Sequence, residues 1–319
     1  MPPVVALVRA ANAESGLSAL WELLGRPFER LGSGANVLIK PSWTCARAPE
    51  TGAGSDLRIA RELARLALEA GAREVVVAEG MGSADNSLDQ VRGIGGLRDM
   101  KNVRVVDLNE AGTREVAVDH PLVVDRFQVP VVVLDADCIV NLAKLKVHPL
   151  AGFSLGFKNM MGALPGRARR WPEEATRQGY PTPYVPGGGK KVFHDLARDL
   201  GREVMQQALV DLNSVVPSHL TIIDGLYGME GPGSPVNGRP VKMDLLIGSR
   251  DIVAAEAVGA AVMGFDPAGL SYLRAAVERG LGAEHRLEAI DVRGVRVEEV
   301  RRGFEPADAS KMWDRGVDA

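Results

Sequence analysis

Basic side chains interrupt an apolar segment at residues 141–162, which reads N-L-A-K-L-K-V-H-P-L-A-G-F-S-L-G-F-K-N-M-M-G. Lys146, His148 and Lys158 lie there among valine, leucine and phenylalanine. A buried ammonium group is costly unless an anion compensates it. An imidazole changes its charge near neutral pH and so can transfer protons. The segment therefore predicts a site that binds an anionic ligand and moves protons.

Two further residues are assigned to the same anion site. Lys40 ends an apolar run at residues 36–39, and Asn159 directly follows Lys158. We expect Lys40, Lys146 and Lys158 to converge and to hold a small molecule that carries a carboxylate or a phosphate. Asn159 would add hydrogen bonds to that ligand.

The buried lysines have an alternative explanation, in which each pairs with a carboxylate from the same edge of the sheet. Glu79 and Asp224 are the carboxylates placed for such pairs, because each follows an apolar run. Glu79 is also a candidate to line the ligand site. Lys144 is assigned to the side opposite Lys146 and is expected to face solvent.

Proton transfer is assigned to two histidines. His148 precedes a proline, which favours an extended backbone and predicts a loop at that position. His194 lies at the start of a predicted helix. Asp224 would orient one of the histidines, or would bind a divalent metal together with both. Lys146 is a fourth catalytic candidate, because burial lowers the pKa of a lysine and makes its amine a nucleophile.

A glycine- and proline-rich loop, M-E-G-P-G-S-P-V-N-G, occupies residues 229–238. Its glycines would let backbone N–H groups approach an anion closely. Glu230 and Asn237 are therefore candidate substrate-binding residues. The alternative is a tight turn that the fold requires. The loop lacks the G-K-[ST] sequence of a nucleotide-binding P-loop.

Strands and helices alternate along the first 80 residues. The predicted strands lie at residues 4–9, 36–39 and 74–78 and are rich in valine and isoleucine. Helices are predicted between them at 17–31 and 55–70, which gives the order β-α-β-α-β. This order is typical of a parallel sheet. We expect an α/β layered sandwich whose central sheet is mostly parallel and is covered by helices on both faces.

The second half of the chain continues the pattern. A strand at 138–142 would end just before the lysines, which places them in a loop at the sheet edge where such folds bind ligands. The other expected elements are a helix at 192–212, strands at 220–223 and 243–247, and a final strand pair at 288–292 and 295–300. We expect one domain over residues 1–319. Residues 165–191 form a basic Pro/Gly-rich insertion, either a lid over the site or a segment without a role.

Composition excludes several classes of protein. The chain has 319 residues, of which 46% are hydrophobic and 25% charged, as in soluble globular proteins. A net charge of -3 argues against nucleic acid or an anionic membrane as the partner. No signal segment or membrane span is recognisable, so a cytoplasmic location is expected. Cys45 and Cys138 lack C-x-x-C spacing, so no self-contained iron–sulfur cluster is expected. Cys138 is assigned to the core, and the role of Cys45 is left open.

Several ordered motifs of this chain resemble the domain of unknown function 362 family. They are K-P-S, N-L-A-K-L-K-V-H, F-K-N-M-M-G, F-H-D-L, I-I-D-G, M-E-G-P-G-S-P-V-N-G and S-R-D-I-V-A-A-E. The resemblance implies a pocket built from these segments and a frequent association with ferredoxin-like modules. This chain lacks the ferredoxin cysteines, and Glu256 stands where relatives often carry aspartate.

Two functions follow from these expectations. The favoured one is an enzyme that acts on a small anionic molecule at a site lined by lysine and histidine, with or without a divalent metal. The alternative is a non-catalytic protein that binds a metal, a cluster or a cofactor and works with a separate iron–sulfur redox partner. The sequence predicts neither the substrate nor the oligomeric state.

Overall fold

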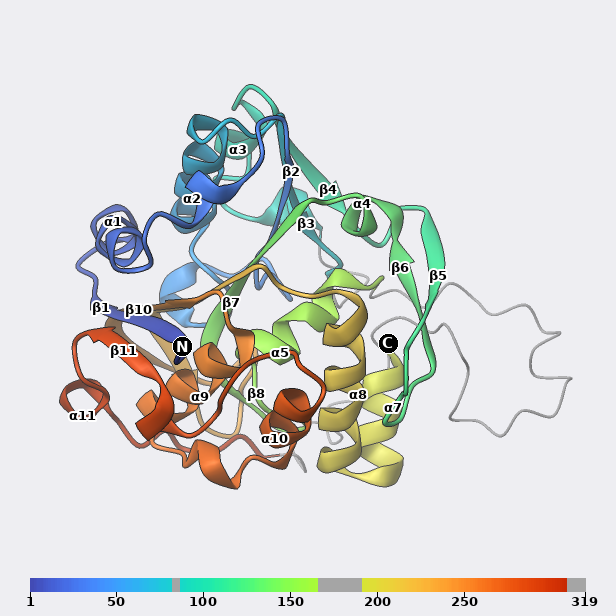
Figure 1. Ribbon diagram of the computed structural model, residues 1–319, viewed down its shortest axis with the longest axis vertical. Coiled ribbons are helices and arrows are strands. Elements are labelled where there is room, and N and C mark those ends of the chain that lie inside the picture. The colour runs from blue at the N-terminus through green and yellow to red at the C-terminus, as the bar shows by residue number, and fades with distance from the viewer. Residues whose placement is uncertain (82–86, 166–190, 309–319) are drawn as a thin grey trace, which may run out of the picture.

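The computed structural model describes residues 1–81, 87–165 and 191–308, and it shows an α/β fold built on a large mixed sheet (Figure 1). Within those residues the main sheet has nine strands, of which β8 (Gly152–Phe153) pairs only with β7. The other eight lie in the order β11 (Asp291–Gly294), β1 (Val4–Arg9), β10 (Arg239–Ser249), β9 (Leu220–Glu230), β7 (Cys138–His148), β2 (Asn36–Lys40), β3 (Glu74–Glu79) and β4 (Val103–Asp107).

The sheet is mostly parallel, as the sequence predicts. The neighbours β9, β7, β2, β3 and β4 all pair in parallel, and β10 is antiparallel to both β9 and β1. The strands β2, β3 and β7 are buried along nearly their whole length, as is typical of inner strands of a parallel sheet. A second sheet contains β5 (Thr113–Ala117) and β6 (Arg126–Pro130).

Successive residues of β2 pack in different hydrophobic clusters. Val37 and Ile39 pack with side chains of α1 (Ala13–Leu23) and α2 (Leu57–Glu69). Leu38 packs in another cluster with side chains of α8 (Arg202–Val215). Alternation of this kind follows from the two-residue period of a strand.

Several predicted boundaries differ from the structure. The helix expected at 55–70 begins later, as α2 at Leu57, and the side chain of Asp56 caps it by accepting a hydrogen bond from the backbone N–H of residue 58. The helix expected at 192–212 is two helices, α7 (Lys191–Leu200) and α8, because Gly201 between them has a φ of 97°. Residues 131–134 form the short helix α4 (Val131–Leu134), although valine is more typical of strands.

The predicted C-terminal strand pair is wrong. Residues 288–290 contain a short 3-10 turn, and β11 pairs in parallel with β1 instead of forming a hairpin. The segment that follows is the helix α11 (Val297–Val300). This segment lies next to α9 (Ile252–Val262) and buries Val297 and Val300, three residues apart, in a helical turn.

The remaining described α-helices are α10 (Ser271–Glu278) and two shorter ones, α3 (Gly95–Arg98) and α5 (Gly156–Asn159). The proposed lid at 165–191 lies almost entirely outside the described residues. Among the residues that are described, no helix has the length and apolar character needed to cross a membrane.

Candidate functional site

The strand β7 is longer than the sequence predicts, and it carries three of the candidate residues. Lys144, Lys146 and His148 belong to the strand itself, so the expectation that they lie in a loop is wrong. They are 0%, 1% and 4% exposed. The prediction that Lys144 faces solvent is also wrong, because residues two apart in a strand point to the same face.

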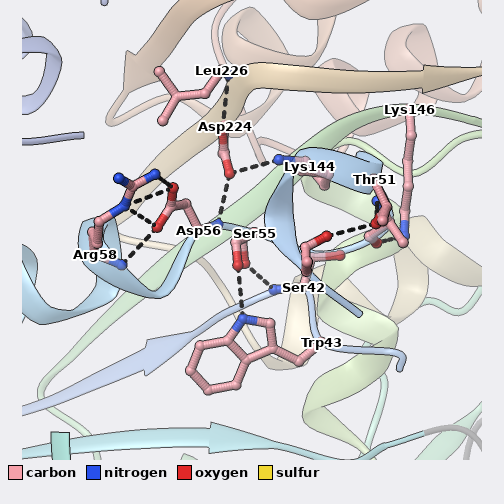
Figure 2. A network of polar contacts seen from close by, with 12 residues as sticks. Ser42, Trp43, Thr51, Ser55, Asp56, Arg58, Lys144, Lys146, Asp224 and Leu226 are labelled. Atoms are coloured by element: carbon pink, nitrogen blue, oxygen red, sulfur yellow. Dashed lines mark hydrogen bonds and ion pairs between the residues drawn. The ribbon is translucent and has the colours of Figure 1, made fainter. Parts of the chain in front are cut away.

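Lys144 forms a buried ion pair with the neighbouring strand. Its Nζ lies 2.8 Å from Oδ2 of Asp224, which is the residue opposite it in β9. The same Oδ2 accepts a hydrogen bond of 2.8 Å from the backbone N–H of Asp56, and Oδ1 accepts one from that of Leu226 (Figure 2). Pairing with a carboxylate of the sheet, the alternative considered for the other buried lysines, thus occurs at Lys144, for which it was not expected.

A second buried pair joins β2 to β3. Nζ of Lys40 lies 2.7 Å from Oε2 of Glu79, and it also donates to Oδ1 of Asn159 at 3.0 Å and to the carbonyl of Pro41 at 2.7 Å. An ammonium has three N–H groups, and three acceptors therefore match all of them. Glu79 also accepts a hydrogen bond from the backbone N–H of Trp43. The charge of Lys40 is thus compensated inside the protein.

Asn159 connects this pair to β7. Its side-chain nitrogen donates to Oδ1 of Asn141 at 2.8 Å and to the carbonyl of Lys40 at 3.2 Å. A Cβ atom placed at Gly162 would overlap both Nζ of Lys40 and a carboxylate oxygen of Glu79. Glycine at that position therefore allows the chain after α5 to pass directly over the ion pair.

Glu256, which the family resemblance singled out, anchors the other end of α5. Its carboxylate accepts hydrogen bonds from the backbone N–H of Phe157 at 3.0 Å and from the hydroxyl of Tyr272 at 2.9 Å. Burial raises the pKa of Glu256 to about 7, and these hydrogen bonds oppose the rise. The carboxylate lies at the start of the short helix that carries Lys158 and Asn159.

Lys146 is buried like the other two lysines but has no carboxylate partner among the described residues. Its Nζ donates to the carbonyl of Ala53 at 2.5 Å and to that of Pro235 at 3.4 Å. Burial lowers the pKa of Lys146 from 10.5 to about 8, against an opposing effect of Cys45; the charges of Lys144 and Lys40 lower it further. An amine of this pKa is present in both its neutral and its charged form slightly above neutral pH.

Two loops approach Lys146 and supply these carbonyls. Ala53 packs with Cys45 and Met229 in a small apolar cluster. Gly52, beside Ala53, has a φ of 73°, and a Cβ there would overlap the carbonyl of Gly228. In the other loop the hydroxyl of Ser234 donates to the carbonyl of Val147 at 2.6 Å. The loop at 229–238 thus offers a carbonyl to Lys146 rather than N–H groups to an anion.

His148 ends β7 and is held as a neutral imidazole. Its Nδ1 accepts hydrogen bonds from the backbone N–H groups of Leu150 at 3.2 Å and Ala151 at 3.1 Å. A neutral ring that accepts at Nδ1 carries its proton at Nε2. Burial lowers the pKa of His148 well below 6.5, and surrounding basic groups lower it further. At neutral pH His148 is therefore a hydrogen-bond donor through Nε2.

The groups that act on His148 define a basic cluster. They are Lys158, His194, Lys146 and Arg202, in decreasing order of their effect on its pKa. We call these four residues and His148 the His148 cluster. The structure thus brings together four of the predicted site residues, from β7, α5 and α7. Arg202 was missed, because nothing in the local sequence distinguishes it from the other arginines of the chain.

Two other predicted substrate-binding residues lie in different surroundings. Glu230 is buried, and its carboxylate accepts hydrogen bonds from Arg239 at 2.8 Å and from Arg302 at 3.1 Å. Asn237 is exposed, and its backbone N–H donates to the carbonyl of Gly233 at 2.7 Å. The structure places neither side chain in hydrogen-bond contact with Lys146 or His148.

A divalent metal does not fit the donors that the structure describes. Within residues 1–81, 87–165 and 191–308, no three histidine, cysteine, aspartate or glutamate side chains form a group that could hold a metal ion. Both oxygens of Asp224 accept hydrogen bonds from the protein, and so does Nδ1 of His148.

Two known proteins are similar to this chain. Thylakoid-associated protein sll1697 of Synechocystis sp. is 25% identical over 283 residues, which are 87% of this chain and 79% of the relative. A crystal structure of a protein from Thermotoga maritima aligns with a TM-score of 0.39 and 15% identity, over 83% of this chain and 57% of that chain, so this chain spans less than two thirds of its length.

The family model described as Domain of unknown function (DUF362) matches residues 37–261. That range includes β7 and β9, and it contains every residue of the two ion pairs and of the His148 cluster. Since the match extends over more than half of the sequence, the chain belongs to the DUF362 family, as its motifs indicated.

Proposed function

We propose that this protein is an enzyme that acts on a small molecule bearing a carboxylate or a phosphate, and that the His148 cluster is its active site. The observation that carries the proposal is the charge of Lys146. Of the three buried lysines on β2 and β7, Lys40 and Lys144 are paired with carboxylates, whereas Lys146 donates only to backbone carbonyls.

A buried positive charge without a counter-ion is unfavourable. Lys146 lies close enough to Lys158, His194 and Arg202 that all four lower the pKa of the same imidazole. An anionic ligand would offset several of these charges at once. Perturbed titrating groups of this kind, gathered at one end of a strand, are typical of functional sites.

The side chains of the cluster suit different tasks. Lys158 and Arg202 would hold the anionic group of the ligand, and Lys146 would lie beside it. His148 would donate a hydrogen bond from Nε2 to an oxygen that gains negative charge in the reaction, because a neutral imidazole is an effective donor to such an oxygen. His194 would exchange the proton, since Nδ1 of His148 is already an acceptor for the backbone.

The other predicted site residues have a positioning role in this proposal. Lys40, Glu79 and Asn159 connect β2, β3 and α5, and Asp224 holds Lys144. They would fix the strand and the short helix from which the cluster projects. Metal assistance is not part of the proposal, because the described donors do not fit a metal ion.

The proposal is tested by substrate consumption and by binding. The protein is incubated with a mixture of small carboxylic acids and phosphate esters, and the mixture is followed by NMR. Wild type should consume at least one compound and bind it reversibly. Lys146→Met and His148→Asn should abolish consumption, whereas Lys101→Met should not.

Lys101 is the matched control, because it is an exposed lysine whose removal changes the net charge by the same amount. If the cluster variants bind and convert the compound as well as Lys101→Met does, the proposal is wrong.

A further inference from the structure

Lys146 differs from Lys40 and Lys144 because its two hydrogen bonds leave one position on Nζ without a partner among the described residues. A neutral amine has two N–H groups and one lone pair, whereas an ammonium has three N–H groups and no lone pair. The carbonyls of Ala53 and Pro235 satisfy two N–H groups, and Nζ has no further partner among the described residues. The surroundings of Nζ therefore match a neutral amine, with its lone pair left unshared.

Lys144 and Lys40 do not have this arrangement. Each is held as an ammonium by a carboxylate within 2.8 Å. A lone pair on either nitrogen would require the loss of an ion pair that is buried in the sheet. Among these three lysines, only Lys146 is free to act as a nucleophile.

We infer that Lys146 forms an imine with a carbonyl compound that also bears an anionic group. This inference rests on the proposed function, and it names the class of substrate: a 2-oxo acid or a phosphorylated ketone. The carbonyl carbon would meet Nζ of Lys146, and the anionic group would contact Lys158 and Arg202 of the His148 cluster.

The step balances without an oxidant or a reductant. The lone pair of Nζ attacks the carbonyl carbon and forms a C–N bond, while the π electrons move to the carbonyl oxygen. A proton passes from nitrogen to that oxygen and gives a carbinolamine. Its hydroxyl then leaves with a second proton as water, and a C=N bond remains. Hydrogen bonding from Nε2 of His148 would stabilise the oxygen during the attack.

The charges also suit the product. An imine is readily protonated, and its positive charge would lie where Lys146 has no carboxylate of its own. The carboxylate or phosphate of the bound substrate would supply that missing negative charge. The pKa of about 8 supports the same reading, because a substantial fraction of Lys146 is then neutral near pH 8.

The inference is tested by reductive trapping. Full-length protein is treated with sodium borohydride in the presence of pyruvate or of dihydroxyacetone phosphate, and the adduct is located by peptide mass spectrometry. We expect one stable adduct on Lys146, formed faster as the pH rises through about 8. The more reactive of the two compounds identifies the anionic group. Lactate, which lacks the carbonyl, should slow trapping and form no adduct. Acetone, which lacks the anion, should label Lys146 at least tenfold more slowly.

The variants separate this inference from the proposed function. Lys146→Met should lose the adduct, and Lys101→Met should keep it. If pyruvate or dihydroxyacetone phosphate binds in a manner that requires His148 and Lys158, yet Lys146 is not labelled, the imine is refuted and the anion site stands. If neither compound binds and adducts appear only on exposed lysines such as Lys101 and Lys242, both ideas fail.

Discussion

Replacement of Lys146 by methionine should make the protein more stable at pH 7, although most substitutions of buried residues destabilise. Methionine has nearly the volume of lysine and no charge, so it fits the same space. The fall of the Lys146 pKa from 10.5 to about 8 corresponds to about 3 kcal/mol at 1.36 kcal/mol per pKa unit. The variant avoids this cost but loses two hydrogen bonds to backbone carbonyls, worth roughly 1 kcal/mol each.

The net gain at pH 7 is therefore about 1 kcal/mol, and its sign should reverse in alkali. Between pH 8 and 10.5 the unfolded chain holds a proton on Lys146 that the folded protein has released. Stability rises with pH wherever the unfolded state binds more protons. Above that range the amine is neutral in both states, so only the hydrogen bonds remain. Wild type should then be about 2 kcal/mol more stable than Lys146→Met.

Lys144→Met is the matched control, because Lys144 lies two residues away on the same strand and is equally buried. Its removal leaves the buried carboxylate of Asp224 without its partner, and losses from such changes are about 3–5 kcal/mol. Both variants and wild type are compared by urea unfolding at pH 7 and pH 11. A loss at pH 7 by Lys146→Met as large as that of Lys144→Met would show that an internal anion already compensates Lys146.

Three further predictions concern the surroundings of the site. His148→Asn should remain folded, because its side-chain oxygen can replace Nδ1 as acceptor. The histidine of folded wild type stays neutral, so below pH 6.5 the stability of wild type should fall faster than that of the variant, by up to about 1.4 kcal/mol per pH unit. Equal falls in the free energy of denaturant unfolding with pH would contradict this. Glu256→Gln should stabilise the protein at pH 8 but not at pH 4.5. The carboxyl pKa of about 7 means that wild type loses stability as the pH rises from 4.5 to 8, because the buried carboxyl group must then ionise. Thermal unfolding at both pH values tests this. Gly162→Ala should cost about 3 kcal/mol in urea unfolding, because its Cβ must displace the Lys40–Glu79 pair; an unchanged midpoint would show that the backbone moves aside.

The parallel core of the fold could be predicted from sequence because its strands are uninterrupted apolar runs. The extensions of β7 and β9 could not, since charged residues in a strand suggest a loop unless their partners are known. Lys144 and Asp224 are far apart in sequence and become partners only through the register of β7 and β9. The placement of helices on both faces of the sheet, the single domain, the redox partner and the cytoplasmic location remain predictions.

The candidate site was predictable to a similar extent. Residue type and apolar context identified Lys146, His148, Lys158 and His194, which the structure brings together. The same criteria could not separate compensated lysines from Lys146, because the difference depends on carbonyls from two distant loops. They also could not identify Arg202, whose importance comes from the approach of α8 to the end of β7.

The proposed activity requires that Lys146 is an uncompensated buried amine that responds to an anion. The direct measurement is an NMR pH titration of the lysine ¹³Cε signals, with Lys146 assigned by substitution, in the absence and presence of inorganic phosphate. We predict a pKa of about 8 without phosphate and a higher value with it, because a bound anion favours the charged amine. An ordinary lysine pKa without phosphate, or a lowered value that phosphate leaves unchanged at saturation, would contradict the claim.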